Sequence, residues 1–583
     1  MLKDIIGISL GNNTSVAVYS PDNGIKFALS EERLTGEKGT KKFPINALKE
    51  AVKLTNYDST LRIALSSYEV INERTLKYLD LGGIAINKNM VIDFYQLLEN
   101  KIRKECNIDH TIRIQFFRVD HHTAHRVPAI YMSGFIEQID PYGIPLVAIT
   151  ADGFGDGLSM TMQDYQTQEI LARETIETSI GLIYQYVTGA LGFKEHRHEG
   201  KVTGLAAYGK PLYKDAFKNK IMDYDKATFN FIPVYLQSDK SYNFDDQEIN
   251  ANIKGFKNML KLKYATYDLV NNLLDDGAKP EDIAASVQFY SESMLHLWVN
   301  NLLDHNMQDE VNLVVSGGIF ANVNFNMVLK NSPSVKDLFV LPASGDEGTA
   351  IGAAIQMAIN EYGKLNLNLK ALTSDDLYLG KIKGKELDTC DIDGSKYIIE
   401  KDVSVHTLAK YLEDDKTIAF SIGYHEFGGR ALGNHSIIAK ASNKKIVDRL
   451  NVALDRNEFM PLAPFTIDLF AEDLFPGQLY GVKKTLKNMT LALKASTDFQ
   501  EKYPAVVHVD NSVRVQVIEE HDNLYVYRLM LEYSKMTNEK VLINTSFNKH
   551  DSPIVFSEQD AYQAFVEADL DVLVLDNKIL RKR

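Results

Sequence analysis

The sequence is poor in cysteine and has no long apolar run, and both absences exclude classes of protein. Its 583 residues include only two cysteines, Cys106 and Cys390. They are too few for a disulfide framework, and their spacing fits no zinc motif. No apolar run is long enough to span a bilayer, so we expect no membrane association. The start lacks the basic end and cleavage site of a signal peptide and is typical of a β-strand, so we expect a cytoplasmic protein.

Positive charge is also in deficit. The chain has 64 Lys and Arg residues against 78 Asp and Glu residues, a formal net charge of -14. This balance opposes non-specific binding of nucleic acid, although it does not exclude a local basic cleft. We therefore interpret the acidity as a source of solubility and expect nucleic acid only as an acceptor substrate. A homodimer remains open.

Strands and glycine-rich turns recur along the first 362 residues. Apolar patterning predicts a strand, a polar turn and a second strand within residues 5–19. It also predicts strands at 25–34 and 61–66 with a helix at 45–54 between them, and then strands at 146–150, 159–162 and 311–315. The second set ends in turns rich in glycine. Two similar sets predict a duplicated α/β fold with a nucleotide cleft between its halves.

The remaining segments suggest where the domains divide. Residues 213–263 have weak periodicity and read as an insertion, whereas Pro280 begins an amphipathic helix that reaches Trp298. A helix at 350–362 closes the first domain. Residues 363–397 show no clear period. We therefore predict domains at 1–362 and 398–583, joined by a linker at 363–397.

Two kinds of pattern point to chemistry. His121 and His125 are four residues apart, so a helix would bring both imidazoles within reach of one metal ion. An isolated pair of this kind is more often a pair of surface histidines. The turn residues Gly153 and Gly155 allow backbone amides to approach phosphate, but one such turn is weak evidence. The combination indicates nucleotide-dependent group transfer.

A stronger phosphate signal follows the strand at 311–315. Gly317 and Gly318 come directly after it, so the backbone can approach adenosine or phosphate closely, and Asn322 offers a polar contact. Lys201 could face a phosphate, although a solvated loop lysine fits the sequence equally well.

Several motifs occur together over nearly the whole chain. They are Asp120–His125, Asp152–Gly157, Gly192–Gly209, Gly317–Asn322, Gly345–Gly348, Gly429–Gly433, Phe459–Pro464, His508–Asp510 and Asn544–Asn548. In this order they resemble the O-carbamoyltransferases that act on nodulation factors and on antibiotics such as tobramycin and cephamycins. So many motifs in the order of that family make a chance match implausible.

The resemblance implies a fold and a reaction. The larger domain would be an actin-like ATPase fold (a duplicated ribonuclease-H-like fold), and the smaller an α/β adenylate-forming domain similar to the threonylcarbamoyl-AMP synthase fold. The smaller domain would convert carbamoyl phosphate and ATP into carbamoyl-adenylate and pyrophosphate. The larger would pass the carbamoyl group to an acceptor hydroxyl and release AMP. ATP would enter as its magnesium complex.

The resemblance also implies a metal-ligand set. The histidine pair and the carboxylates of the two aspartate turns map to His121, His125, Asp152 and Asp346. These four ligands suit iron, which the resemblance favours, and equally manganese or zinc. A divalent metal can polarise a carbonyl or stabilise the oxyanion that forms on it. His122 is the weaker ligand candidate and is expected to orient a ligand instead.

Four residues of the second domain suit phosphate. Arg430 stands between glycines, where a guanidinium could hold a phosphate through two hydrogen bonds. Arg456, Arg514 and Ser546 lie in or beside other motifs. The alternative for each arginine is a surface charge, which is least convincing for Arg430 and Arg514.

Three positions depart from the family pattern. Asn12 and Asn13 stand where the family has His-Asp, and asparagine can orient a hydroxyl but cannot take its proton. We therefore expect Asn13 to orient the acceptor. His435 replaces an arginine, and Asp455 replaces a lysine near two anionic substrates. A shifted lysine such as Lys440, Lys444 or Lys445 would compensate.

Two other functional classes compete with carbamoyl transfer. A sugar or acetate kinase on the same fold would explain the glycine turns but not the histidine pair or the second domain. A non-enzymatic ATP-driven binding module conflicts with the metal ligands. The acceptor could be a hydroxyl of a sugar, an antibiotic scaffold or a hydroxymethylated nucleobase.

Overall fold

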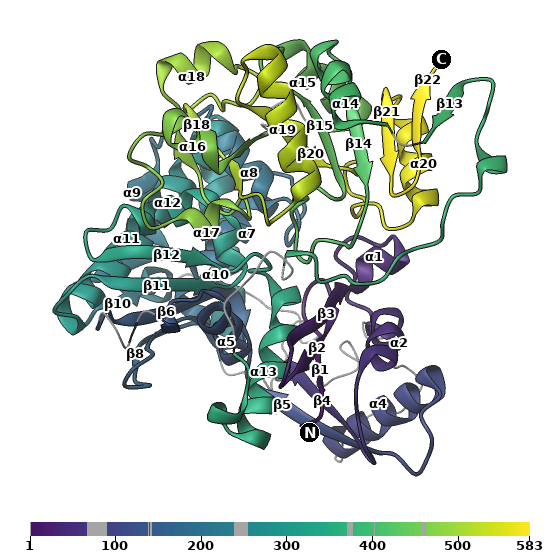
Figure 1. Ribbon diagram of the computed structural model, residues 1–583. Coiled ribbons are helices and arrows are strands. Elements are labelled where there is room, and N and C mark those ends of the chain that lie inside the picture. The colour runs from purple at the N-terminus through teal and green to yellow at the C-terminus, as the bar shows by residue number, and fades with distance from the viewer. Residues whose placement is uncertain are drawn as a thin grey trace.

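Three sheets organise the molecule (Figure 1). The computed structural model describes residues 2–66, 90–137, 139, 143–237, 255–369, 377–401, 403–456 and 462–583. Parts of the predicted segments 213–263 and 363–397 lie outside these ranges, as do Phe459, Met460 and Pro461 of one motif. In Figure 1 the C-terminal residues, green to yellow, form the upper part, and the two N-terminal sheets lie below it.

The first sheet has the strand order β3-β2-β1-β4-β5. Its strands are β1 (Ile5–Ser9), β2 (Ser15–Ser20), β3 (Gly24–Ser30), β4 (Thr60–Ser66) and β5 (Arg113–Val119). The pairs among β1, β2 and β3 are antiparallel, and β4 runs parallel to both β1 and β5.

The second sheet repeats that topology. Its order is β12-β11-β6-β7-β8, with β6 (Leu146–Gly155), β7 (Leu158–Asp164), β8 (Ile170–Thr175), β11 (Val311–Ser316) and β12 (Val335–Val340). Here β6, β7 and β8 pair antiparallel, whereas β11 runs parallel to both β6 and β12. The repetition confirms the predicted duplicated α/β fold.

Two helices join the sheets through close backbone contacts. They are α5 (His121–Met132) and α13 (Thr349–Tyr362). A Cβ at Gly7 of β1 would lie 1.9 Å from the carbonyl oxygen of Ala350, and one at Gly352 would lie 1.8 Å from that of Ala124. Only glycine fits at these positions, so α13 can pack directly on β1 and on α5.

The other helices of the N-terminal part surround these sheets. They are α1 (Glu31–Thr35), α2 (Ile45–Leu54), α4 (Met90–Cys106), α7 (Ile180–Ala190), α8 (Glu199–Ala206), α9 (Lys214–Lys220), α10 (Phe256–Asp275), α11 (Pro280–Asn306) and α12 (Val323–Lys330). The helix predicted from Pro280 continues beyond Trp298 to Asn306. The described part of the predicted insertion contains α9, the hairpin of β9 (Asp223–Asp225) and β10 (Asn230–Ile232), and the start of α10.

The strand predicted at 25–34 is wrong at its end. β3 stops at Ser30, and Glu31 begins α1. The carboxylate of Glu31 accepts hydrogen bonds from the backbone N–H groups of Asn46 and Ala47 in the first turn of α2. This long-range cap satisfies N–H groups that a helix start leaves free, and the sequence pattern alone does not show it.

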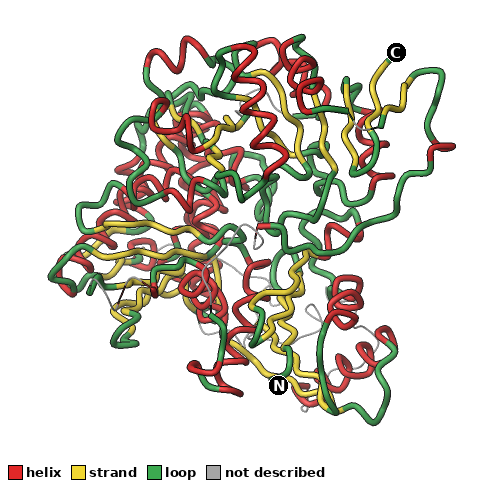
Figure 2. Tube along the Cα trace, viewed as in Figure 1, coloured by secondary structure: helices red, strands yellow, loops and turns green. Residues whose placement is uncertain are grey.

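The third sheet carries the C-terminal part. Its order is β13-β22-β21-β14-β15-β20-β16-β19, with β13 (Tyr397–Glu400), β14 (Ile418–Ser421), β15 (Ser436–Lys440), β16 (Ala463–Ile467), β19 (Gln516–Ile518), β20 (Leu542–Ser546), β21 (Val572–Leu575) and β22 (Ile579–Lys582). A small second sheet pairs β17 (Leu493–Lys494) with β18 (Ser512–Val513). Figure 2 shows the strands of the three larger sheets in yellow. The smaller α/β unit predicted from the sequence is confirmed.

Helices cover both faces of the third sheet. They are α14 (Val405–Glu413), α15 (Lys444–Ala453), α16 (Asp468–Leu474), α17 (Lys483–Leu486), α18 (Thr497–Lys502), α19 (Leu524–Thr537) and α20 (Glu558–Glu567). Along β14, Ile418 and Phe420 belong to the core under α14 and α19, whereas Ala419 belongs to the core under α15 and α20. Because neighbouring residues face opposite sides of a strand, β14 is apolar on both faces from Ile418 to Phe420.

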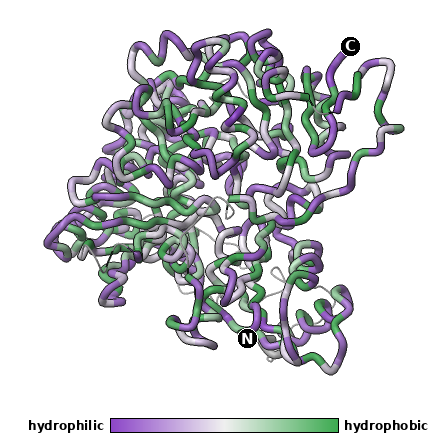
Figure 3. Tube along the Cα trace, in the orientation of Figure 1, coloured by the Kyte–Doolittle hydropathy of each residue, from purple (hydrophilic) through white to green (hydrophobic). Residues whose placement is uncertain are grey.

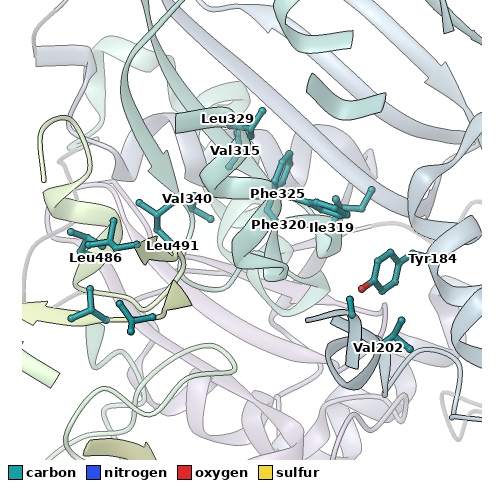
Figure 4. Packing of buried hydrophobic residues seen from close by; sticks show 14 of the residues in the cluster. Tyr184, Val202, Val315, Ile319, Phe320, Phe325, Leu329, Val340, Leu486 and Leu491 are labelled. Atoms are coloured by element: carbon teal, nitrogen blue, oxygen red, sulfur yellow. The ribbon is translucent and has the colours of Figure 1, made fainter. Parts of the chain in front are cut away.

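The two parts share one core. Leu486 and Leu491 of the C-terminal part lie beside Val340 of β12 (Figure 4). The hydroxyl of Thr485 donates to the carbonyl oxygen of Leu338 at 2.7 Å, and the Leu338 N–H donates to the carbonyl oxygen of Gly481 at 2.8 Å. In Figure 3 hydrophobic colour continues across this junction. The C-terminal part is therefore docked firmly on an edge strand of the second sheet.

None of the described helices has the length and apolar character that crossing a bilayer requires.

Candidate functional site

One turn of α5 presents the histidine pair. Asp120 caps the helix by accepting a hydrogen bond from the Thr123 N–H, and Asp156 accepts one from the His121 N–H at 2.7 Å. Because the helix begins at His121, residues 121 and 125 point from the same face. The carboxyl end of β6 lies against this face and carries Asp152, and the turn before α13 carries Asp346.

The four side chains converge on one point. Asp152 Oδ2 lies 3.0 Å from His121 Nε2 and 3.2 Å from His125 Nε2. Asp346 Oδ1 lies 3.7 and 3.8 Å from the same two nitrogens. Their donor atoms all fall within 4.8 Å of one another. Two imidazoles and two carboxylates at this spacing form a metal-ligand group.

Neighbouring backbone fixes the orientation of the ligands. The Ser316 hydroxyl lies 3.2 Å from His125 Nδ1, which leaves Nε2 to face the carboxylates. The Asn12 N–H donates to Asp346 Oδ2 at 2.6 Å, and the Gly153 N–H donates to Asp152 Oδ1 at 2.6 Å. Contacts of this kind set the rotamers and basicity of metal ligands.

Glycines give the ligands their space. A Cβ at Gly155 would lie 2.3 Å from His121 Cδ2, and one at Gly11 would lie 2.3 Å from Asp346 Oδ2. Gly317 has a φ of +117°, and a Cβ there would lie 2.0 Å from the Ala151 carbonyl oxygen. At Gly318 the nearest atom would be Asp152 Oδ1, at 3.4 Å. These glycines thus border the metal-ligand group, and any phosphate contact they make would be made beside it.

We expect Gly155→Ala to weaken metal binding by about 10- to 100-fold, the range typical of residues that orient ligands. The added methyl group would overlap the His121 ring. Metal titration of the metal-free protein measures the change. Gly394→Ala, at a position with open space, serves as the control. Unchanged affinity in Gly155→Ala would contradict this packing argument.

Electrostatics in the group favour charge separation. Burial opposes protonation of His125, but hydrogen bonds to Asp152 and Asp346 outweigh it and raise the pKa of His125 to about 9. Burial also opposes ionisation of Asp152, yet both histidines hold its pKa well below the usual range. A cation can replace the shared proton in such a set, because metal ligands bind in their deprotonated forms.

His122 lies outside the group. Its Nδ1 is 2.7 Å from the Thr150 hydroxyl, and its Nε2 is buried without a hydrogen-bond partner among the described residues. Burial, followed by the charges of His121 and His125, lowers the pKa of His122 to about 3. It therefore stays neutral beside the ligands.

A cavity of about 460 Å³ runs between the two parts of the molecule. The N-terminal part contributes Asn13, Glu32, Lys38, Gly39, His196, Arg197, His198, Gly200 and Lys201 to its lining. The C-terminal part contributes Gly429, Arg430, Ala431, Arg456, Leu462, Met489, Arg514, Asn544, Thr545, Ser546, Asn548, His550 and Asp551. The predicted residues Asn13, Lys201, Arg430, Arg456, Arg514 and Ser546 thus meet in one cavity.

Three arginines form its cationic end. Burial lowers the pKa of Arg430 and lowers that of Arg456 to about 10. Burial, followed by the charges of these two neighbours, holds the pKa of Arg514 well below its usual range. Among the described residues no carboxylate forms an ion pair with any of the three. Clustered guanidiniums without an acidic partner are an anion-binding site.

Ser546 and Arg456 are joined directly. Arg456 donates to the Ser546 carbonyl oxygen at 2.8 Å and to its hydroxyl at 3.0 Å, and it also bonds the Thr545 hydroxyl. Arg430 donates to the carbonyl oxygen of Ala321 in the N-terminal part at 3.3 Å. The anion site therefore touches both parts of the molecule.

Asn322 was predicted as a polar contact to the nucleotide, but it does not line the cavity. It caps α12, and its amide donates to Gln288 Oε1 at 2.9 Å. The neighbouring Asn324 lines a smaller side chamber, together with Thr203, His508 and Arg514. Asn322 thus supports the chamber wall through α12.

The structure explains why an aspartate is tolerated at position 455, where the family has a lysine. Asp455 is exposed and does not line the cavity, so its charge stays away from the anion site. Lys440, Lys444 and Lys445 do not line it either. The lysines in the cavity wall are Lys38 and Lys201, both from the N-terminal part.

His435 belongs to a buried network. Its Nδ1 lies 3.0 Å from Glu426 Oε2, and its ring stacks on His425 at 3.9 Å. Burial opposes ionisation of Glu426, but the charge and hydrogen bonds of His435 lower the pKa of Glu426 to about 2. Glu426 also accepts backbone N–H bonds from Leu432, Asn434 and His435. His435 therefore shapes the loop behind Arg430.

Lys38, Glu32 and His196 are cavity residues that sequence reasoning missed. Lys38 lies in a charged loop that looks like ordinary surface. Burial lowers its pKa, with partial compensation from Glu32 and Asp551. The one signal in the sequence of this loop is its pair of glycines, Gly36 and Gly39, and both have a left-handed backbone in the structure.

Comparisons with known proteins identify the family of the chain. The family described as Carbamoyltransferase N-terminus matches residues 4–355, and that described as Carbamoyltransferase C-terminus matches residues 409–582. Nodulation protein NolNO of Sinorhizobium fredii is 27% identical over 97% of this chain and 78% of its own length. Nodulation protein U of the same species is 32% identical over 46% of each chain. The solved structure of HypF from T. kodakarensis is 14% identical, with a TM-score of 0.29 over 63% of this chain and 49% of that one.

Proposed function

Because the chain belongs to the carbamoyltransferase family and is an enzyme of the transferase class, we propose that it is an ATP-dependent O-carbamoyltransferase that works in two steps. Residues 398–583 form carbamoyl-adenylate, residues 1–362 transfer the carbamoyl group, and residues 363–397 link the two domains. The observation that carries this proposal is one cavity with three arginines, next to a metal-ligand group. Both substrates are cytoplasmic metabolites, so we place the enzyme in the cytoplasm.

The first step joins carbamate to AMP. One water molecule hydrolyses carbamoyl phosphate to carbamate and inorganic phosphate. A carbamate oxygen then attacks the α-phosphorus of ATP, which enters as its magnesium complex. Pyrophosphate leaves, and carbamoyl-adenylate remains. Arg430, Arg456 and Arg514 are suited to hold the phosphates of the two substrates, and Ser546 adds a hydroxyl. The three arginines are half-buried, so less water screens their charges than at the open surface.

The second step transfers the carbamoyl group. An acceptor hydroxyl attacks the carbamoyl carbon, the bond to the adenylate oxygen breaks, and AMP leaves. Asn13 lines the cavity one residue after Asn12, whose N–H bonds Asp346. Its amide is therefore suited to orient the acceptor beside the metal-ligand group. We propose that the acceptor is a hydroxyl of a sugar, a natural product or a hydroxymethylated nucleobase.

His121, His125, Asp152 and Asp346 would hold the metal. The donor set fits a divalent ion, and we propose iron, with manganese or zinc as alternatives. When bound, the metal would supply Lewis-acid stabilisation of negative charge on the carbamoyl oxygen.

The two sites share a reactive intermediate. A mixed anhydride hydrolyses in bulk water, so release between the steps would waste it. The arginines and Asn13 line the same cavity. We therefore infer that carbamoyl-adenylate moves inside it.

We expect the purified enzyme to release AMP and pyrophosphate from ATP only when carbamoyl phosphate is present. Coupled assays for each product, with and without carbamoyl phosphate, measure this. ADP formation with a sugar would instead indicate a kinase, and slow ADP release without any acceptor would indicate a binding module. Mass spectrometry of reactions with candidate acceptors then identifies the carbamoylated product.

A further inference from the structure

Transfer to a hydroxyl needs a base, and the loop nearest the metal-ligand group offers none. The hydroxyl oxygen becomes a good nucleophile only as it loses its proton. Asn12 is held beside Asp346, and Asn13 lines the cavity. Their amides can donate or accept hydrogen bonds but cannot take a proton at neutral pH. The base has to come from another element of the cavity wall.

Three titratable residues line the cavity near Asn13. They are Glu32, Lys38 and His196, whereas the cavity residues His198 and His550 lie 3.6 and 3.7 Å from the Asp551 carboxylate and form a separate group with it. Lys201 is the other lysine of the wall and suits phosphate. Glu32 Oε2 accepts a hydrogen bond from the Gly39 N–H at 2.8 Å, so its carboxylate is committed to the loop that it shapes. Burial lowers the pKa of Lys38, and Glu32 and Asp551 only partly oppose this. A lysine ammonium nevertheless starts from a pKa of about 10.4, far above that of histidine, so it is the poorer base at neutral pH. His196 is the remaining candidate.

The backbone presents His196 to the cavity in a constrained way. Its φ is +65°, in the left-handed region that side chains other than glycine rarely adopt. The Glu199 carboxylate holds the His196 N–H at 2.6 Å, and Arg197 bonds the Lys38 carbonyl oxygen. Strained residues held by several contacts are concentrated at functional sites.

The charges around His196 come from several elements. Lys41 of the loop after α1 and Glu195 of its own loop lie within electrostatic range, as do Asp346 and Asp152 of the metal-ligand group. His196 thus lines the same cavity as Asn13 and experiences the charge of both carboxylates. His196 is exposed, but the protein packed around it and the charge of Lys41 lower its pKa, and the three carboxylates only partly oppose this. Its imidazole is therefore neutral at pH 7.

We propose that His196 is the general base for carbamoyl transfer, an assignment that rests on the proposed function. A ring nitrogen of His196 takes the proton of the acceptor hydroxyl while the oxygen attacks the carbamoyl carbon. The bond from that carbon to the phosphate oxygen of AMP breaks, and AMP leaves with the electron pair. The imidazolium then returns its proton to solvent. The products are an O-carbamoyl ester and AMP.

The test compares nucleophiles that need a base with one that does not. Water and methyl α-glucoside must lose a proton to react, whereas hydroxylamine attacks at neutral pH through the free lone pair of its nitrogen. We expect His196→Asn to lower AMP release with water or the glucoside by about 100-fold or more, the range of general-base catalysis. AMP release with hydroxylamine should stay within about twofold, with hydroxyurea as the product. Asparagine also tolerates the left-handed backbone at this position.

The pH profile gives a second readout. In the unchanged enzyme, transfer to the hydroxyl nucleophiles should rise with pH and level off below about pH 6.5, the ordinary pKa of histidine. His196→Asn should lose this break. His296→Asn, at an exposed histidine on α11, is the matched control and should change nothing.

Two results would overturn the assignment. One is an equal loss with hydroxylamine and with the hydroxyl nucleophiles, which would mean that His196 supports the site only structurally. The other is a retained pH break in His196→Asn. Failure of the proposed function looks different, because the unchanged enzyme would then form no AMP in response to carbamoyl phosphate, and the assignment would fail with it.

Discussion

The double variant His121→Ala/His125→Ala is expected to retain no tightly bound metal and to lose carbamoyl transfer. Both imidazoles face Asp152 and Asp346, and His125 is fully buried, so no solvent-exposed group can replace it. Two carboxylates alone are a poor site for iron or zinc, which favour imidazole ligands. Release of pyrophosphate in response to carbamoyl phosphate should continue, because the arginine cluster belongs to the other end of the cavity. Elemental analysis of the purified protein and the two partial assays measure these outcomes.

The same helix supplies the control. His122→Asn removes a buried histidine whose nitrogens do not face the ligand group. We expect it to keep its metal content even if its stability falls. Unchanged metal content in the double variant would show that these four residues do not hold the ion.

Local patterns predicted seven strands and three helices of the N-terminal part, and they missed others such as β5, β8, β12, α4 and α7. Residues 45–54 form a helix with the predicted bounds, and Val311 begins a strand as predicted. The helix buries one face and the strand buries both. The spacing of their apolar residues therefore predicts each element without knowledge of the element that packs against it. Glu31 shows the limit, because its carboxylate caps a helix fifteen residues further on. The strand predicted to continue through Glu31 therefore ends at Ser30.

The sequence predicted the candidate site most directly where two residues of the same ligand type are only a few positions apart. His121 and His125 are four residues apart, and this spacing is informative on any helix. Lys38 and His196 carried no comparable signal. They reach the cavity because Arg197 bonds the carbonyl oxygen of Lys38, which fixes two loops that are far apart in the sequence. Such pairings are tertiary, and one sequence does not reveal them.

The variant Arg514→Ala should lose most adenylate formation without losing stability. No ion pair or hydrogen bond to a described residue holds the Arg514 side chain, and Arg430 and Arg456 repel its charge. The guanidinium therefore lowers the stability of the folded protein unless a bound anion balances its charge. Removing a buried arginine that pairs with phosphate costs about 2–4 kcal/mol of transition-state binding. Release of pyrophosphate in response to carbamoyl phosphate should thus fall about thirtyfold or more.

Arg430→Ala should show a similar loss of activity, but its bond to the Ala321 carbonyl oxygen makes some loss of stability expected as well. Arg449→Ala is the matched control, because Arg449 is half exposed and pairs with Asp571 at 2.9 Å. A thermal melt and the pyrophosphate assay on all three variants separate the two effects. If Arg514→Ala melts at a clearly lower temperature, the guanidinium has a structural partner. If it releases pyrophosphate at a nearly normal rate, the phosphates bind elsewhere. The mutual repulsion of the three arginines would then have no bound anion to balance it.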